Sequence, residues 1–297
     1  MPDPAPQRYG VVETRDLVES HRLIDREADA EVLVAPMRGG MVTEFHIGDD
    51  QLLFIDRATL RDHGQNVRGG IPILFPFAGK LTDDAFTIDG ERRSMPQHGF
   101  ARKMPWRIDS VDTQAAAVLS LSLEASTATL TSWPFRFRLA FTYRLCEGAL
   151  TIEQHFANHS DTPMPIHPGL HPYFQMEDHH KAAARVITKA TSAIDNLTGA
   201  LVSITGPIDL SKGEVNLQLL DHDAPTLEFQ RPEKPPLLLT FDPPPPVVTL
   251  WALPGRNFVC IEPWARAADA VNRGEALWVP PGGEHRESFT IARSSPA

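Results

Sequence analysis

The most restrictive feature of this sequence is a strict alternation of apolar and polar residues with a period of two. In the run 135–145 every odd position is apolar, whereas the even positions are Arg, Arg, Ala, Thr and Arg. Such a pattern gives a strand one dry face and one wet face, which is typical of antiparallel sheets. The alternation resumes at Leu150 and Ile152 after the turn pair Glu147-Gly148. This region therefore predicts a β-hairpin.

Short runs of the same kind recur along the chain and predict an all-β fold. They cover residues 31–35, 41–47, 51–56, 116–125, 215–219, 237–242, 247–253, 258–262 and 287–292. No amphipathic helix of four turns is present, and 27 prolines and 19 glycines punctuate the runs. We therefore expect a mostly antiparallel β-sandwich with few short helices. The proline-rich segments 232–236 and 243–246 are interpreted as loops at strand ends, so residues 1–297 are expected to form one domain.

Charge and cysteine content narrow the possible partners and the location. The formal net charge of −10 argues against nucleic acid and anionic membranes, although a few local cations could still hold a phosphosugar. Cys146 and Cys260 are the only cysteines and do not form a disulfide framework; the apolar run 257–262 suggests that Cys260 is a buried thiol. Residues 1–6 lack the features of a secretion signal and no apolar run could span a membrane, so a cytoplasmic location is expected.

Two histidine-containing segments and one carboxylate-containing segment are each framed by Pro, Gly and aromatic residues, and they suggest one composite site. His98 lies in the segment 95–102, between Pro96 and Gly99, which places it on a turn. It could orient a polar ligand or be an ordinary surface histidine. His171 precedes Pro172 and is therefore biased towards an extended backbone. A partly buried imidazole there could act as a general acid or base, or could be a core histidine bonded to a carbonyl.

Glu262 is the candidate carboxylate. In an extended strand it shares a face with Phe258 and Cys260. A carboxylate on an apolar face is costly unless it is paired or used chemically. Burial would raise its pKa and suit it to proton transfer. The alternative interpretation is a buried salt bridge to an arginine.

The spacing of two histidines raises the alternative of a metal site. His167 and His171 have helical chelate spacing, but Pro168, Gly169 and Pro172 exclude a helix. In a strand the two histidines would lie about 13 Å apart, which is too far for one ion. We therefore expect no metal, with a cupin-like metal site as the alternative. The sequence also lacks a G-x-S-x-G motif, a P-loop and a dinucleotide fingerprint, so no cofactor is expected.

Four segments in the right order resemble the signatures of the aldose 1-epimerase (mutarotase) family, most closely its LacX-like branch. They are residues 69–81, 96–102, 169–174 and 258–264, the last followed by Ala268-Asp269. The resemblance spans nearly the whole chain. It implies a galactose mutarotase-like β-supersandwich with a shallow sugar cleft.

The resemblance also implies residue roles. Glu262 matches the general base, His171 matches the general acid, and His98 matches a histidine that orients the sugar. Lys80 stands where many relatives carry arginine. The positive charge is kept, but the planar guanidinium that can donate two parallel hydrogen bonds is lost. The expected substrate-binding set is His98, Lys80, Arg102, Asp242 and Trp264, the last because an indole can stack on a sugar.

Three functions follow as hypotheses. The first is an aldose 1-epimerase that acts on a free hexose by acid/base ring opening. The second is a hexose-6-phosphate 1-epimerase, which needs a basic cluster at the cleft; the candidates are Arg68, Arg92, Arg93 and Arg102. The third is a carbohydrate-binding or sensing protein without turnover. A small sugar is the expected partner in each case, and the oligomeric state is left open.

Overall fold

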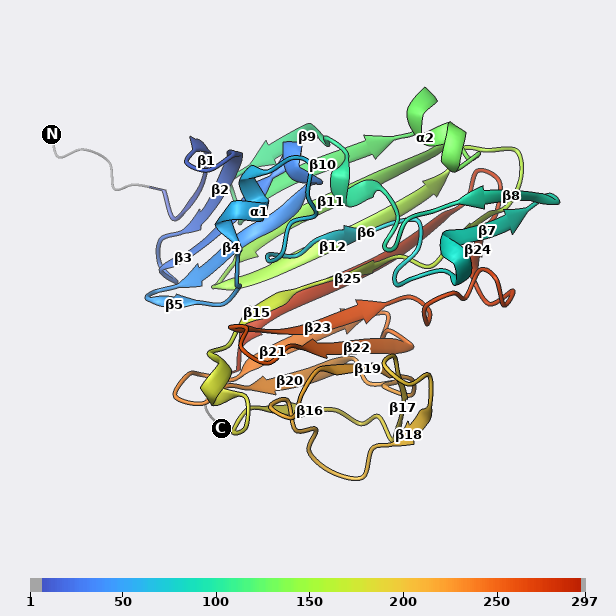
Figure 1. The fold of residues 1–297 in the computed structure, drawn as a ribbon. Coiled ribbons are helices and arrows are strands. Elements are labelled where there is room, and N and C mark those ends of the chain that lie inside the picture. Colours follow the sequence, from blue (N-terminus) through green and yellow to red (C-terminus); the bar gives the residue numbers. More distant parts are fainter. Residues whose placement is uncertain (1–6, 295–297) are drawn as a thin grey trace, which may run out of the picture.

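The computed structural model describes residues 7–294. The segment 1–6, on which the expectation about a secretion signal rests, lies outside the described residues. Every pair of named strands within 7–294 is antiparallel, and the helices are short (Figure 1). The all-β expectation is therefore confirmed. No helix in this range is long and apolar enough to cross a membrane.

The N-terminal part of the chain forms a five-stranded sheet. Its strands follow one another in space as in sequence: β1 (Tyr9–Arg15), β2 (Glu19–Asp25), β3 (Ala30–Ala35), β4 (Met41–Ile47) and β5 (Asp50–Gln51). The predicted run 51–56 is not one strand. Beyond β5 the chain makes only isolated bridges, Leu53 to Phe174 and Ile55 to Gly69, because its neighbours there are two different segments.

An eight-stranded sheet contains the predicted hairpin. Its order is β16 (Arg185–Ile187), β20 (Thr226–Gln230), β21 (Leu237–Asp242), β25 (Glu284–Arg293), β12 (Ala149–Asn158), β11 (Phe137–Cys146), β10 (Ala117–Glu124) and β9 (Arg107–Asp112). Along β11 buried and half-buried residues alternate without exception. Glu147 and Gly148 turn the chain with positive φ angles of 52° and 73°. The hairpin prediction is confirmed.

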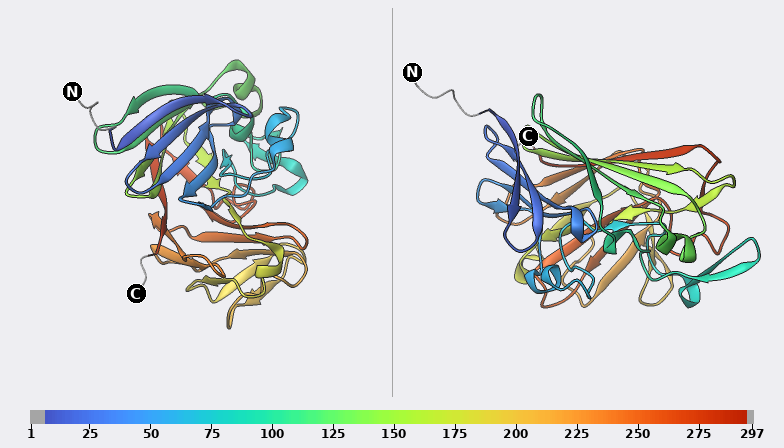
Figure 2. Two further views of the ribbon diagram at one scale, coloured as in Figure 1. Left: turned by 90° about the vertical axis from the view of Figure 1, so that its left-hand side faces the viewer. Right: turned by 90° about the horizontal axis from the view of Figure 1, so that it is seen from above.

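A second eight-stranded sheet forms the floor of the candidate site. Its order is β18 (Leu201–Ser203), β17 (Ser192–Asp195), β19 (Val215–Leu219), β22 (Val247–Ala252), β23 (Phe258–Trp264), β14 (Gly169–Leu170) and β6 (Ile73–Leu74), with β15 (Tyr173–Gln175) also paired to β23. Strands β19, β22 and β23 lie in the lower part of the molecule, and β9 to β12 lie in the upper part (Figures 1 and 2).

The remaining elements are small. They are the hairpin β7 (Ala85–Ile88) and β8 (Glu91–Ser94), the pair β13 (Met164–Ile166) and β24 (Leu277–Val279), the helices α1 (Arg57–Arg61) and α2 (Thr127–Ser132), and the 3₁₀ turns Pro36–Arg38, Thr82–Asp84, Ala101–Lys103 and Asp178–His180. Asp56 caps α1, and Ser126 caps α2 through a capping box with Thr129. Such caps satisfy backbone N–H groups that these short helices cannot satisfy internally.

One continuous apolar cluster joins the sheets. It includes Phe45 from the N-terminal sheet, Phe141 and Phe156 from the sheet of β11 and β12, and Ile261 from β23. Each fully buried phenylalanine stabilises the fold by about 1.5–3 kcal/mol relative to an exposed one. The proline-rich segments lie in the loops before β21 and β22, as expected. The interpretation as one domain stays a prediction.

Candidate active site

A polar cleft of about 610 Å³ lies over the second eight-stranded sheet. Its size is typical of sites for small molecules. The residues that line it are Asn66, Val67, Arg68, Gly79, Lys80, Gln97, His98, Arg102, His171, Tyr173, Asn196, Glu214, Asn216, Thr249, Trp251, Glu262, Trp264 and Ala268. Six of the seven residues expected at the site from the sequence are among them.

The central strand β23 supplies the carboxylate. Successive side chains of a strand point to opposite faces, so Phe258, Cys260, Glu262 and Trp264 share one face. The other face contributes Ile261 to the core. Glu262 is only 2% exposed, so the strand carries a carboxylate into an almost dry position.

The register of two short strands brings His171 to this carboxylate. β14 and β15 both pair with β23 in one antiparallel register, at Gly169 and at Tyr173 respectively. His171 lies midway between these two residues and therefore opposite Glu262. Pro172 has no N–H, and the ladder is interrupted at this point. The cleft floor thus carries an imidazole and a carboxylate side by side.

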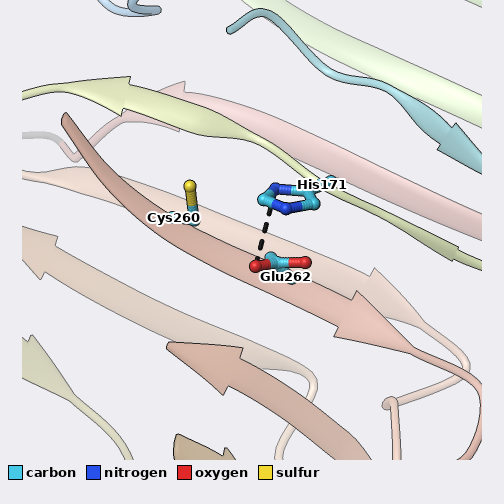
Figure 3. Close-up of side chains that lie close together, drawn as sticks. All are labelled: His171, Cys260 and Glu262. Carbon is cyan, nitrogen blue, oxygen red and sulfur yellow. Dashed lines mark ion pairs between the residues drawn. The ribbon is translucent and has the colours of Figure 1, made fainter. Parts of the chain in front are cut away.

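His171 and Glu262 form a close buried pair (Figure 3). The distance from His171 Nδ1 to Glu262 Oε1 is 3.5 Å, and His171 is 6% exposed. Burial lowers the pKa of His171 to about 3 and raises the pKa of Glu262 well above its usual range. Burial disfavours the charged form of each group. The pKa of His171 therefore falls below that of Glu262, which is the reverse of their order in water. Burial therefore favours the neutral form of each group, which leaves one proton in the pair, on Glu262.

Neighbouring side chains orient the pair. The Trp264 indole donates its Nε1–H to Glu262 Oε2 at 3.2 Å. This hydrogen bond favours the carboxylate and opposes the effect of burial on the Glu262 pKa. The Tyr173 ring stacks on the His171 ring, with centroids 4.6 Å apart and planes 6° apart. Both contacts restrict the rotation of the two groups.

His98 lies on a tight turn beside the pair. Its backbone has φ 68°, and its ring centroid is 5.4 Å from that of His171. The N–H of Gly79 donates to His98 Nδ1 at 3.0 Å. Nδ1 is therefore an acceptor, and the neutral ring carries its proton on Nε2, which lies 3.2 Å from the side-chain amide nitrogen of Gln97. Burial, followed by the charges of His171 and Arg102, holds the pKa of His98 well below its usual value, so His98 is a neutral hydrogen-bond donor.

Three cations are among the residues that line the cleft. Arg68, Lys80 and Arg102 all line it. Arg102 donates to the backbone carbonyl of Gln97 at 2.7 Å. Within residues 7–294 no carboxylate lies at ion-pair distance from any of the three. The cleft therefore contains three cations without a carboxylate partner among the described residues, in a chain that is negative overall.

The lining also contains amides that the sequence analysis missed. Asn196 donates from Nδ2 to Asn216 Oδ1 at 2.7 Å, and the Gln218 side chain donates to Asn196. The Trp251 indole donates to Glu214 at 2.9 Å. β17 and β19 bring these residues together across about twenty positions of sequence. No local motif marks them, because the pairing of two distant strands creates the cluster.

Asp242 and two of the candidate arginines do not reach the cleft lining. Asp242 is exposed at the end of β21, which belongs to the other eight-stranded sheet. Arg92 and Arg93 both lie on β8. Arg92 pairs with Asp83, and Arg93 pairs with Glu91. The basic residues of the cleft lining are consequently Arg68, Arg102 and the additional Lys80.

His167 does not join His171 in a metal chelate. Its ring is fully buried and stacks on Phe77, with centroids 4.5 Å apart. Within the described part of the chain, the group of metal-capable donors is His171, Cys260 and Glu262, whose ligand atoms lie within 4.8 Å of one another. Sequence reasoning treated Cys260 only as a buried thiol, which it is.

An antiparallel β-sandwich with a buried acid/base pair on the floor of a polar, aromatic-lined cleft has the features of a carbohydrate-handling enzyme. The aldose 1-epimerase family model matches residues 24–224 of the chain. The chain belongs to this family of isomerases, as the four sequence segments predicted.

Solved structures of other proteins share the fold of this chain. The Slr1438 protein from Synechocystis sp. PCC 6803 is 32% identical over the full length of both chains, with a TM-score of 0.90. A galactose mutarotase-like protein from Clostridium acetobutylicum shares the fold at a TM-score of 0.83 and 15% identity, over 97% of this chain and 99% of that one.

Curated relatives match part of the chain. A protein from Escherichia coli K12, provisionally named glucose-6-phosphate 1-epimerase, is 29% identical over 159 residues, which is 50% of this chain and 48% of that protein. A Salmonella typhimurium protein with the same provisional name is 29% identical over 136 residues, 44% of this chain and 40% of that protein. The match thus spans half or less of the curated relatives.

Proposed function

We propose that this protein is an aldose 1-epimerase that interconverts the α and β anomers of a hexose. The observation that carries the proposal is the His171–Glu262 pair at the floor of the cleft, with 3.5 Å between Nδ1 and Oε1. Anomer exchange needs one base and one acid near two oxygens bonded to the same carbon. Two adjacent groups that carry one proton between them meet this requirement.

The reaction opens and recloses the hemiacetal ring. Ionised Glu262 takes the proton from the C1 hydroxyl while protonated His171 gives a proton to the ring oxygen, and the bond between C1 and that oxygen breaks. The aldehyde then rotates about the C1–C2 bond. The two proton transfers run backwards when the ring closes on the other face of C1. Groups in such roles typically contribute about 10²–10⁴-fold each.

The burial of the pair suits this cycle. The closed sugar needs ionised Glu262 and protonated His171, whereas the open sugar leaves protonated Glu262 and neutral His171. In water the ordinary pKa values would favour the charged arrangement by about 2 units, or roughly 3 kcal/mol. Burial raises the pKa of Glu262 and lowers that of His171. It therefore disfavours the charged arrangement, so the proton is not held on His171 when the ring opens.

The residues around the pair have supporting roles in the proposal. His98 offers an Nε2–H to a sugar oxygen, since its Nδ1 is occupied by Gly79. Trp264 lines the cleft beside Glu262, where an indole can pack on the C–H face of a sugar. These proton transfers require neither a metal nor a redox cofactor. A cytoplasmic location remains a prediction.

A phosphorylated hexose is the substrate that the charges of the cleft favour. Arg68, Lys80 and Arg102 line the cleft without carboxylate partners among the described residues. Charge-assisted hydrogen bonds from such groups are the usual means of holding a phosphate. The provisional names of the curated relatives refer to glucose 6-phosphate, which agrees with this second candidate.

The test of the chemistry is NMR magnetisation exchange between the anomeric protons of glucose, galactose and glucose 6-phosphate. We expect exchange above the uncatalysed rate, and a loss of about 10²–10⁴-fold in His171→Asn. No acceleration with any of these sugars would contradict the proposal. Sugar binding without exchange, unchanged in the variant, would instead support a carbohydrate-binding protein.

The test of the phosphate preference compares two sugars in one variant. Lys80→Met should lower kcat/KM for glucose 6-phosphate by about tenfold or more, because a charge-assisted bond contributes about 1.5–3 kcal/mol. The value for free glucose should stay nearly constant. Lys103→Met is the matched control, since Lys103 is exposed but does not line the cleft. Equal losses on both sugars would contradict the phosphate assignment.

A further inference from the structure

Cys260 lies beside the His171–Glu262 pair without lining the cleft (Figure 3). The thiol is fully buried and packs with Tyr173 and Phe258. One donor atom each from His171, Cys260 and Glu262 lies within 4.8 Å of the other two. The proton-transfer pair therefore has a third, unused donor directly beside it.

The backbone brings these three donors together. Cys260 and Glu262 are two residues apart on one face of β23, and His171 lies opposite Glu262 in the register of β14 and β15. His171 Nδ1 has no hydrogen-bond partner in the part of the chain that the structure describes. A buried nitrogen without a partner has a lone pair or a proton available for a ligand.

A thiolate, an imidazole and a carboxylate are ligands that Zn²⁺ uses in proteins. Tetrahedral zinc has bonds of about 2.0–2.3 Å, so its ligand atoms lie roughly 3.3–3.8 Å apart. The distance of 3.5 Å between His171 and Glu262 already falls in that range. The 4.8 Å limit for the whole group is wider than that range, so the proposal requires the Cys260 thiol to move closer to the other two donors. Three protein ligands with an open fourth position form a common zinc arrangement.

We propose that His171, Cys260 and Glu262 form a binding site for a thiophilic divalent cation such as Zn²⁺, which reversibly inhibits the enzyme. The ion enters through the cleft and displaces two protons: a Zn–S bond replaces the S–H bond of the Cys260 thiol, a Zn–O bond replaces the O–H bond of the protonated Glu262 carboxyl, and 2 H⁺ are released. Glu262 and His171 coordinate the ion as carboxylate and neutral imidazole. The inhibition rests on the proposed epimerase function, whereas the binding site does not.

Inhibition follows because both proton-transfer groups become ligands. A carboxylate bonded to zinc cannot take the C1 proton, and an imidazole bonded through Nδ1 is no longer part of a proton-sharing pair. Cys260 distinguishes this site from ordinary inhibition by surface-bound zinc. It also predicts a preference for zinc over Mg²⁺, since magnesium requires oxygen ligands.

The binding site is tested first, without any sugar, by adding Co²⁺ to the metal-free full-length protein. Cobalt bound to a thiolate has a sulfur-to-metal charge-transfer absorption band. We expect this band in the wild type and in Cys146→Ser, and not in Cys260→Ala. Bound cobalt without the band in the wild type would overturn the proposal even if the variant failed to fold.

The inhibition is then tested by anomer exchange at buffered free Zn²⁺ concentrations. We expect inhibition that a chelator reverses, and a zinc affinity about 100-fold weaker in Cys260→Ala, since even partners of metal ligands contribute 10–100-fold. Each variant is compared with its own zinc-free rate. Equal zinc sensitivity in Cys260→Ala and the wild type would overturn the proposal. Absence of exchange with every sugar would refute the epimerase function alone, because the cobalt band still reports the site.

Discussion

The most informative perturbation of the proposed mechanism is Trp264→Phe. It removes the indole N–H that donates to Glu262 Oε2 at 3.2 Å, while an aromatic ring remains. A hydrogen bond to a charged group contributes about 1.5–3 kcal/mol. At 1.36 kcal/mol per pKa unit, its loss should raise the Glu262 pKa by about 1–2 units.

The direction of the change in activity follows from the one proton that His171 and Glu262 carry between them. The reactive form has ionised Glu262 and protonated His171. Without the indole donor the proton moves further towards Glu262, so the reactive fraction falls about 10- to 100-fold where the pair holds one proton. The alkaline limb of the profile should move to higher pH by about 1–2 units, because it reports loss of that proton. The two enzymes should therefore converge at high pH.

The assay is kcat/KM for anomer exchange as a function of pH, after subtraction of the uncatalysed rate. Trp251→Phe is the matched control, because it removes a similar indole bond, at 2.9 Å to Glu214, elsewhere in the same cleft. The control should keep the wild-type position of the alkaline limb. A uniform loss at every pH in Trp264→Phe would refute the reasoning, since it would indicate disturbed packing rather than a changed ionisation.

Four further outcomes are expected. His98→Asn should fold, because asparagine tolerates the left-handed backbone, but it should raise KM about tenfold through loss of the Nε2–H donor; a wild-type KM would contradict this role. Arg231→Met should cost about 3 kcal/mol in a denaturant titration, because Asp50 is buried against Arg231 at 2.8 Å, with the exchange rate per folded molecule unchanged. Burial opposes the ionisation of Asp50, but Arg231 and its neighbours keep the Asp50 pKa low, so the free energy of unfolding should decrease as the pH falls below about 4. Exhaustive chelation should leave the exchange rate intact, and a loss that added metal restores would contradict a metal-free reaction.

The sequence predicted the fold where local pattern decides it. The strict alternation in 135–145 survives in β11 because one face packs on the core and the other is solvated. The prediction of one strand over residues 51–56 was wrong because the pairing partners, Phe174 and Gly69, come from different parts of the chain. Alternation alone carries no information about which strand lies next to it.

The site was predictable where a motif and a backbone constraint coincide. His98, His171 and Glu262 were found because Pro and Gly set the turns and the strand around them, and the structure brings all three to one cleft. Asn196 and Asn216 were missed because their contact depends on the pairing of β17 with β19. Asp242 was expected in the cleft, but its strand belongs to the other eight-stranded sheet.

The central claim is that Glu262 removes the C1 proton of a sugar. The most direct test is the anomer exchange rate of Glu262→Gln beside the wild type, measured by NMR on glucose 6-phosphate and glucose. The amide keeps the shape of the side chain and cannot accept that proton, so the variant should keep the wild-type melting temperature and lose about 10²–10⁴-fold of the catalysed rate. A folded Glu262→Gln protein with the wild-type rate would contradict the account.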